Sequence, residues 1–184
     1  MGDNMKILKI ITDENEILRE KSLPVTFPLS KADKQLIKEM HEYLKNTQVE
    51  EIAEKYNLRP GFGLAFVQLG RLLRIFVTVI EEEDGTFTYH TFINPEIISY
   101  SEELICAQEE GCLSVTCDVP GVIPRHARIT IKAYDPEGNE FTYRAREEEA
   151  IGIQHELDHL DGILYYDHID KNSPFKYADT LRMI

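Results

Sequence analysis

The segment QHELDHL, Gln154–Leu160, contains an HExxH sequence with two histidines four residues apart. On a helix, residues four apart lie on one face about one turn from each other, so both imidazole rings can reach one metal ion. Glu156 follows His155 directly, and its carboxylate can act on an activated water without being a ligand. The motif therefore predicts a metal-dependent hydrolase site on a helix, around which the other elements must be arranged.

The residues around the motif indicate that this helix is buried. Three acidic residues, Glu147–Glu149, stand where the helix should begin and suit the positive end of its dipole, and Gly162 follows as a stop signal. A surface helix with two incidental histidines is the alternative. Burial counts against it, because buried His and Glu side chains need partners that a metal ion can provide. The flanking residues are apolar over most of the helix: Ala150, Ile151, Ile153, Leu157 and Leu160.

Length and composition predict one soluble globular domain spanning residues 1–184, with 42% hydrophobic and 29% charged residues. No apolar run approaches the roughly 20 residues that a membrane helix needs, and Met1–Lys9 lacks the features of a signal peptide. We therefore expect a cytoplasmic protein that does not contact a membrane. The cysteines are odd in number and show no disulfide pattern, which fits a reducing compartment: Cys106, Cys112 and Cys117.

The formal net charge of −13 argues against direct nucleic-acid binding, which relies on basic residues that contact phosphates. Contact with a ribosome or a membrane surface would require a local basic patch, and the sequence shows no strong one. The simplest interpretation of the acidic excess is a well-solvated surface.

The remaining periodicities predict an α+β fold: antiparallel sheets packed around a central HExxH-bearing helix, with an N-terminal helix. Ser30 resembles a capping residue for that N-terminal helix, whose apolar residues recur at helical spacing through Leu44. Residues Val49–Tyr56 either continue it or form a second short helix. We expect strands over residues 72–80, 87–93, 97–100, 103–107, 128–134 and 140–146, with Asn94-Pro95 breaking the second.

Two further segments carry residues suited to chemistry. GFGLAFVQ, residues 61–68, has two glycines that permit close backbone approach, although alone it is more simply a turn entering a strand. EGCLS, residues 110–114, places Cys112 after a glycine, although a lone cysteine is more often buried and inert. With QHELDHL, and in this order and spacing, these segments resemble the three motifs of peptide deformylases, roughly GxGLAAxQ, EGCLS and QHExDH.

The resemblance is closest to the longer deformylases of Gram-positive type and covers nearly the whole chain. The second and third motifs match in full. The first departs from the family pattern: Phe66 replaces its second alanine, and Val67 stands where Pro or Thr is common. The bulkier Phe66 is either absorbed by the core behind the loop or shifts the loop and tilts Gln68.

The resemblance implies that one divalent metal ion is bound by Cys112, His155 and His159. It also implies Fe(II) as the native ion, with Ni(II), Co(II) or Zn(II) able to replace it. Three protein ligands leave the open coordination position that a catalytic site requires. Glu156 is then the general base, while the side-chain amide of Gln68 and the backbone N–H of Leu113 stabilise the oxyanion.

By the same resemblance the substrates are N-formyl-methionyl nascent peptides, from which the N-formyl group is removed as formate, close to the ribosome. The backbones of Phe62 and Gly63 would bind the peptide by adding it beside a strand. Ile151 and Gly152 would line the pocket for the methionine side chain. A pairing of Glu110 with Arg125 would brace the Cys112 loop.

Two alternatives remain open at this stage. One is a zinc peptidase that uses the same HExxH and takes a third ligand downstream, where His168 is available at an unusual spacing. EGCLS has no role in that alternative. The other is a protein of the same fold that binds formyl-methionyl peptides or metal without turnover, and Phe66 is the one feature that favours it.

Overall fold

The computed structural model describes residues 6–184. The prediction that Met1–Lys9 is not a signal peptide therefore falls partly outside the described residues. The described helices are η1 Glu16–Arg19, α1 Lys31–Gln48, α2 Glu50–Tyr56, η2 Phe66–Leu69, α3 Glu147–Leu160 and η3 Tyr165–His168. The strands are β1 Gly63–Ala65, β2 Ile75–Glu81, β3 Phe87–Tyr100, β4 Leu104–Cys106, β5 Arg125–His126, β6 Arg128–Tyr134, β7 Glu140–Arg146 and β8 Arg182–Met183.

The strands form two sheets. The larger is antiparallel with the order β1-β2-β3-β6-β7, which leaves β1 at one edge. The smaller has the order β5-β4-β8, in which β8 runs parallel to β4. An α+β fold is therefore confirmed, with an antiparallel larger sheet and a smaller sheet that contains one parallel pair.

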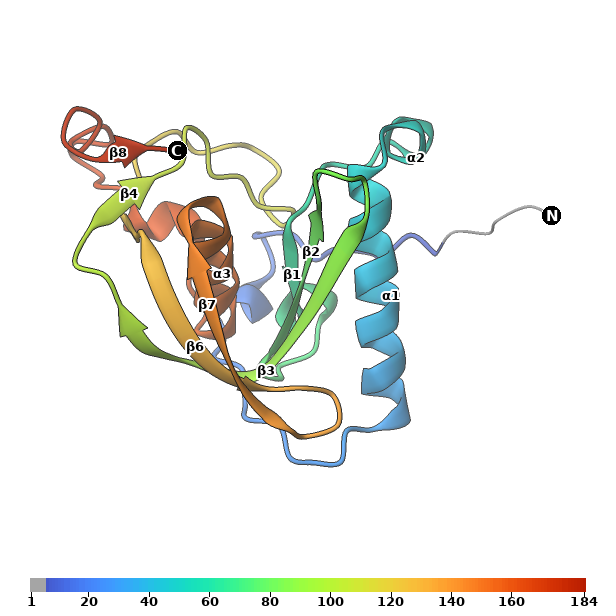
Figure 1. Cartoon of the computed structure of the whole chain (residues 1–184). Helices are drawn as coiled ribbons and strands as arrows, with labels where there is room; N and C mark the ends of the chain where they lie inside the picture. Colours follow the sequence, from blue (N-terminus) through green and yellow to red (C-terminus); the bar gives the residue numbers. More distant parts are fainter. Residues whose placement is uncertain (1–5) are drawn as a thin grey trace.

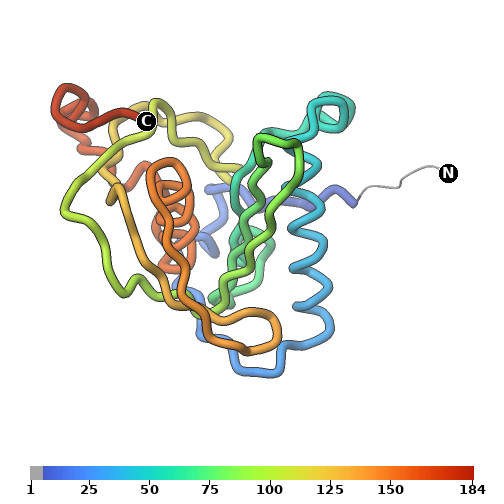
Figure 2. The backbone as a smooth tube through the Cα atoms, in the orientation of Figure 1, coloured from blue at the N-terminus to red at the C-terminus, as the bar shows by residue number. Residues whose placement is uncertain are grey.

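The two long helices pack on different parts of the larger sheet (Figure 1). α1 contacts β1, β2 and β3, whereas α3 contacts β1 and β2 together with β6 and β7. The backbone trace in Figure 2 shows the sheet curving around α3, with α1 outside the curve. Apolar side chains fill both interfaces: Ile37, Met40, Leu44 and Val77 beside α1, and Phe76, Phe92, Ile131, Ile153 and Leu160 beside α3.

The local signals at the helix ends agree with the structure. Ser30 caps α1, because its side chain accepts a hydrogen bond from the backbone N–H of Asp33. Residues Glu50–Tyr56 form a separate short helix, which decides between the two expectations for that segment. Three glutamates fill the first turn of α3, and Gly162 adopts a positive φ of 72° just after it. Within residues 6–184, no helix has both the length and the apolar character needed to cross a membrane.

The expectation that Asn94-Pro95 ends a strand is wrong. β3 continues to Tyr100, and the strand register shifts between Ile93 and Glu96, so the proline lies at an irregularity where it removes no regular ladder bond. Asn94 has a positive φ of 49°, and its side-chain amide bonds both backbone groups of Val25. A contact distant in sequence therefore supports the irregular backbone.

Candidate metal centre and active site

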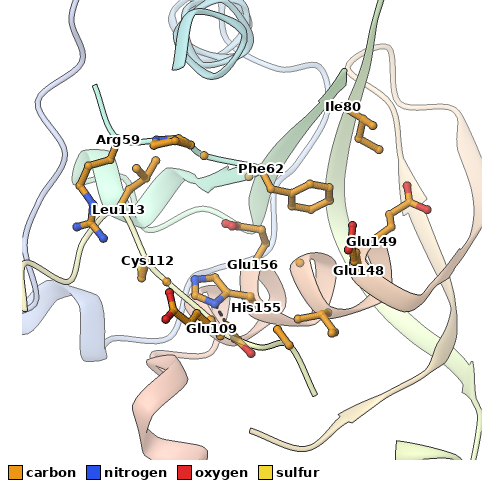
Figure 3. Close-up of a pocket in the computed structure, with 18 of the residues that line it drawn as sticks. Arg59, Phe62, Ile80, Glu109, Cys112, Leu113, Glu148, Glu149, His155 and Glu156 are labelled. Carbon is orange, nitrogen blue, oxygen red and sulfur yellow. Dashed lines mark hydrogen bonds and ion pairs between the residues drawn. The ribbon is translucent and has the colours of Figure 1, made fainter. Parts of the chain in front are cut away.

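The predicted metal ligands meet although they come from separate segments. His155 and His159 lie one turn apart on α3, and Cys112 lies in the loop after β4. One donor atom from each lies within 4.8 Å of the others, and Cys112 Sγ is 3.2 Å from His159 Nε2. All three side chains are buried. Figure 3 shows Cys112, His155 and Glu156 grouped together in the pocket.

This donor set fits a divalent transition metal. One thiolate and two imidazoles are ligands of zinc, iron and nickel, and three protein donors leave a position for a reactant. Burial lowers the pKa of His159 well below its usual value, with smaller effects of the charges on His155 and Arg125. Burial of His159 thus favours its neutral form, which is the form that coordinates a metal.

Glu110 fixes the orientation of the His155 ring. Its Oε1 lies 2.9 Å from His155 Nδ1, so the Nε2 atom is left for a metal. Burial opposes ionisation of Glu110, but hydrogen bonds with His155 and Arg125 outweigh it and lower the pKa to about 2. Burial likewise lowers the pKa of His155, yet hydrogen bonds with Cys112 and Glu110 raise it to about 10. A metal ion must displace the proton that this raised pKa places on His155, so we expect metal affinity to increase as pH rises.

Arg125 connects the Cys112 loop to the helix that carries the histidines. It pairs with Glu110, as the sequence suggested, through two nitrogen atoms, and its Nη1 lies 2.6 Å from Asp158 Oδ2. The Arg125 side chain is only 4% exposed. Asp158 also lies 2.7 Å from His168 Nε2. The role of Asp158 was missed from sequence, although it lies inside the HExxH motif.

His168 does not join the group of ligands. Its ring binds Asp158, on the outer side of the Arg125 network, and the metal-ligand cluster found among residues 6–184 contains Cys112 instead. This arrangement disfavours the zinc-peptidase alternative, which needs its third ligand downstream of the helix.

Glu156 lies beside the ligands with one carboxylate oxygen, Oε2, buried and without a hydrogen-bond partner among the described residues. Burial raises the pKa of Glu156 to about 7, although the charge on His155 opposes the rise. The carboxylate is tightly enclosed: a Cβ added to Gly63 would lie 2.6 Å from Glu156 Oε1. Glycine at this position is therefore a steric requirement of the Glu156 side chain.

Gln68 faces the ligands from η2. Its Oε1 accepts a hydrogen bond from the Ala65 N–H at 2.8 Å, which fixes the amide plane. Its Nε2 lies 3.0 Å from Ser114 Oγ and 3.9 Å from Cys112 Sγ. The Ser114 contact uses one amide proton and leaves the other directed toward the cluster. Ser114 was missed from sequence, although it belongs to the EGCLS segment.

Phe66 is accommodated by the core. Its side chain is fully buried in the cluster between α1 and the sheet, together with Leu44 and Leu64. Gln68 keeps the contacts described above. The structure thus favours absorption of the bulkier residue over a tilted Gln68.

A pocket of about 450 Å³ opens beside the ligands. Figure 3 places Phe62 and Ile80 on one side of it, and Arg59 and Leu113 on another. The predicted substrate-binding residues Phe62, Gly63, Ile151 and Gly152 and the predicted oxyanion residue Leu113 all line it. Gly152 allows the Phe62 ring to approach α3, because a Cβ there would lie 2.4 Å from two ring carbons.

Comparison with known proteins agrees with this geometry. The family model described as polypeptide deformylase matches residues 7–175. The chain belongs to the polypeptide deformylase family. It is 48% identical over 169 residues to a peptide deformylase from Ligilactobacillus salivarius, covering 90% of this chain and 91% of that protein. It is 44% identical over 171 residues to peptide deformylase 2 from Bacillus anthracis, covering 92% and 93%.

Solved structures of the deformylase family share the fold. A class I type b peptide deformylase from Acinetobacter baumannii, crystallised with Met-Ala-Ser bound, has a TM-score of 0.72 and 27% identity, covering 90% of this chain and 99% of that one. A peptide deformylase from Legionella pneumophila has a TM-score of 0.72 and 29% identity, covering 92% and 89%. Membership in this family of hydrolases, predicted from the three motifs, is confirmed.

Proposed function

We propose that this protein is a metal-dependent deformylase that removes the N-formyl group from the N-terminal methionine of newly made proteins and releases formate. The observation that supports this most is the buried group of one thiol and two imidazoles, with the Glu156 carboxylate beside it and a pocket opening at strand β1. Because its substrates arise where proteins are made, we place the activity in the cytoplasm near ribosomes.

Cys112, His155 and His159 would hold the metal, and Glu110 would orient His155 through the 2.9 Å contact. We propose Fe(II) as the physiological ion, with Ni(II), Co(II) or Zn(II) able to replace it, since the donor set accepts all four. When bound, the ion supplies Lewis acidity toward water and the formyl oxygen.

Glu156 carries the proton transfers in this mechanism. Its carboxylate takes a proton from the attacking water, whose oxygen forms a bond to the formyl carbon. It then delivers that proton to the peptide nitrogen as the C–N bond breaks, which leaves formate and a free α-amine. The close approach of Gly63 would limit the movement of the Glu156 carboxylate between the two transfers.

Gln68 and Leu113 would stabilise the negative charge that develops on the formyl oxygen. The amide of Gln68 is held by Ala65 and Ser114, and its second proton, which now points at Cys112 Sγ, would move only a short way to reach the formyl oxygen. The backbone N–H of Leu113 lies next to Cys112 at the wall of the pocket. Removal of one such donor typically lowers kcat by about 10²–10³.

The peptide would bind as an added strand beside β1. β1 is an edge strand, and the Phe62 carbonyl accepts a hydrogen bond from Val79 of β2 at 3.0 Å. Alternation along the strand then turns the backbone groups of Gly63 toward the free edge. Met-Ala-Ser is bound by the Acinetobacter deformylase, and an N-terminal methionine side chain would here enter the part of the pocket lined by Ile151 and Gly152.

The decisive test measures formate release from a formyl-Met peptide. The protein is loaded anaerobically with Fe(II), or with Ni(II), and its metal content is determined. We expect turnover that is lost in Glu156→Ala while about one metal per chain remains bound. If the loaded wild-type protein binds the peptide but releases no formate, the proposal is wrong and the binding-only alternative is correct.

A further inference from the structure

The C-terminal end of α1 contacts the loop that leads into the substrate-binding edge. Thr47 and Gln48 are its last two residues, and both bond to Gly61, two residues before Gly63. We propose that Thr47 and Gln48 are positioning residues that set the place of this edge for the peptide. This inference rests on the proposed function, because the edge is assigned to peptide binding there.

Gln48 joins the loop to β2. Its Nε2 donates one hydrogen bond to the Gly61 carbonyl at 2.8 Å and one to the Val79 carbonyl at 2.9 Å. Both amide protons are therefore used. The backbone N–H of Val79 donates a hydrogen bond to the Phe62 carbonyl at 3.0 Å. Gln48 therefore binds the same residue of β2, Val79, that joins β2 to this loop.

Thr47 holds the other backbone group of the same glycine. Its hydroxyl accepts from the Gly61 N–H at 3.1 Å and donates to the Leu44 carbonyl at 2.7 Å, and the residue is 1% exposed. Both backbone polar groups of Gly61 thus bind side chains of α1. The pairing of β1 with β2 begins only at Gly63. Without Thr47 and Gln48, the β1–β2 pairing would therefore leave the backbone of Gly61 unsupported.

Gly61 also lies against the oxyanion side of the pocket. A Cβ at this glycine would lie 2.9 Å from Leu113 Cδ1 and 3.1 Å from Leu44 Cδ2. A shift of Gly61 would therefore change its contacts with Leu113 on one side and with Leu44 of α1 on the other. α1 in this way connects the peptide edge with the loop that carries Cys112.

The alternative is a purely structural role, in which the Thr47 and Gln48 side chains only stabilise the C-terminal end of α1. In that case their loss would lower stability and leave KM unchanged in the folded protein. A positioning role instead predicts that KM rises about tenfold while kcat falls by less than about threefold, as expected when binding common to ground and transition states is lost.

The test uses the full-length, metal-loaded protein with Gln48→Met, which keeps the length of the side chain and removes both donors. Gln35→Met is the matched control, because Gln35 is an exposed residue of the same helix and its Nε2 hydrogen-bonds only to Glu39 on that helix. We expect the rise in KM for a formyl-Met peptide in the first variant alone. Equal KM values in the wild type and Gln48→Met would overturn the inference.

A second pair of variants serves if Gln48→Met does not fold. Thr47→Val keeps the shape of the side chain and removes the hydroxyl, whereas Thr47→Ser restores it. We expect a raised KM in Thr47→Val and recovery in Thr47→Ser. Equal KM values in these two variants would contradict the role assigned to the hydroxyl.

Amide hydrogen exchange gives a readout that needs neither metal nor substrate. We expect the Val79 N–H in Gln48→Met, and the Gly61 N–H in Thr47→Val, to exchange about tenfold faster or more, with amides of β6 unchanged. Unchanged exchange at both sites overturns the inference. If wild-type protein releases no formate while these amides respond, the proposed function fails and the anchoring of the loop by α1 stands.

Discussion

Replacement of Arg125 by methionine tests whether the buried ion network holds the candidate metal centre together. The substitution retains most of the apolar stem and removes the guanidinium, so the carboxylates of Glu110 and Asp158 keep only their contacts with His155 and His168. The two carboxylates are 7% and 17% exposed, respectively. Because both would be left charged and poorly solvated, we expect a loss of about 3–5 kcal/mol in the free energy of unfolding.

The pKa of Glu110 provides an independent magnitude. Burial opposes the fall in this pKa from 4.5 to about 2, and the net effect of the contacts with His155 and Arg125 corresponds to about 3 kcal/mol. Because the folded pKa is depressed, this stabilisation is present above the unfolded value of about 4.5 and is lost as pH falls toward 2. The stability difference between wild type and Arg125→Met should therefore be full at pH 7 and shrink below pH 4.5.

Thermal and denaturant unfolding measure the effect, with Arg128→Met as the matched control. Arg128 is 59% exposed and pairs with Glu103, so its loss should cost less than about 1 kcal/mol. For a chain of this length the loss in Arg125→Met corresponds to a fall in Tm of roughly 6–20 °C. We also expect weaker metal retention, by about 10–100-fold in affinity, because Glu110 orients His155. Normal stability and metal content in Arg125→Met would refute the reasoning.

Three further substitutions test packing and capping. Gly63→Ala should lower kcat about 10²-fold with metal still bound, because its Cβ would lie 2.6 Å from Glu156 Oε1; an unchanged kcat would show that the carboxylate has room to move. Gly152→Ala should raise KM, because its Cβ would lie 2.4 Å from the Phe62 ring, and adding Phe62→Val should reverse the rise; additive effects in this double-mutant cycle would contradict the packing. Ser30→Ala should cost about 1 kcal/mol in unfolding experiments without altering KM, and an unchanged Tm would argue against the cap.

The elements that the sequence predicted well are those with local causes. Strands 128–134 and 140–146 match β6 and β7, because alternating side chains and an intervening turn with Gly138 set both the pairing and the register. The helix of the HExxH motif was predicted from the acidic first turn and the stop at Gly162. In each case the residues that decide the structure are neighbours in the chain.

The elements that were missed depend on contacts between distant residues. β8 pairs with β4 across more than seventy positions, and Ile184 bonds the Cys106 carbonyl at 2.9 Å, although the tail looks polar and irregular in sequence. β3 passes through Asn94-Pro95 because the Asn94 amide binds Val25 in a separate segment. Local propensity could not predict either arrangement, because its cause lies elsewhere in the chain.

The same distinction applies to the candidate site. The candidate ligand group was predictable, since the histidines, the cysteine and Glu156 are types that a metal hydrolase requires, and the structure brings the two histidines and the cysteine together. The contacts that hold these residues in place were only partly predictable. The pairing of Glu110 with Arg125 was predicted as a hypothesis, whereas the contact of Arg125 with Asp158 was seen only in the structure.

The glycines show why the support is harder to predict than the chemistry. Gly63 leaves room for a side chain of α3, Gly152 for an aromatic ring from the loop before β1, and Gly61 for Leu113. Each glycine marks a close approach between two segments, and the sequence alone does not predict which segment approaches it. The edge proposed to bind substrate, the candidate general base Glu156 and the loop that carries Leu113 thus meet at backbone positions without side chains, and a substitution at any of the three glycines tests a contact that no single motif contains.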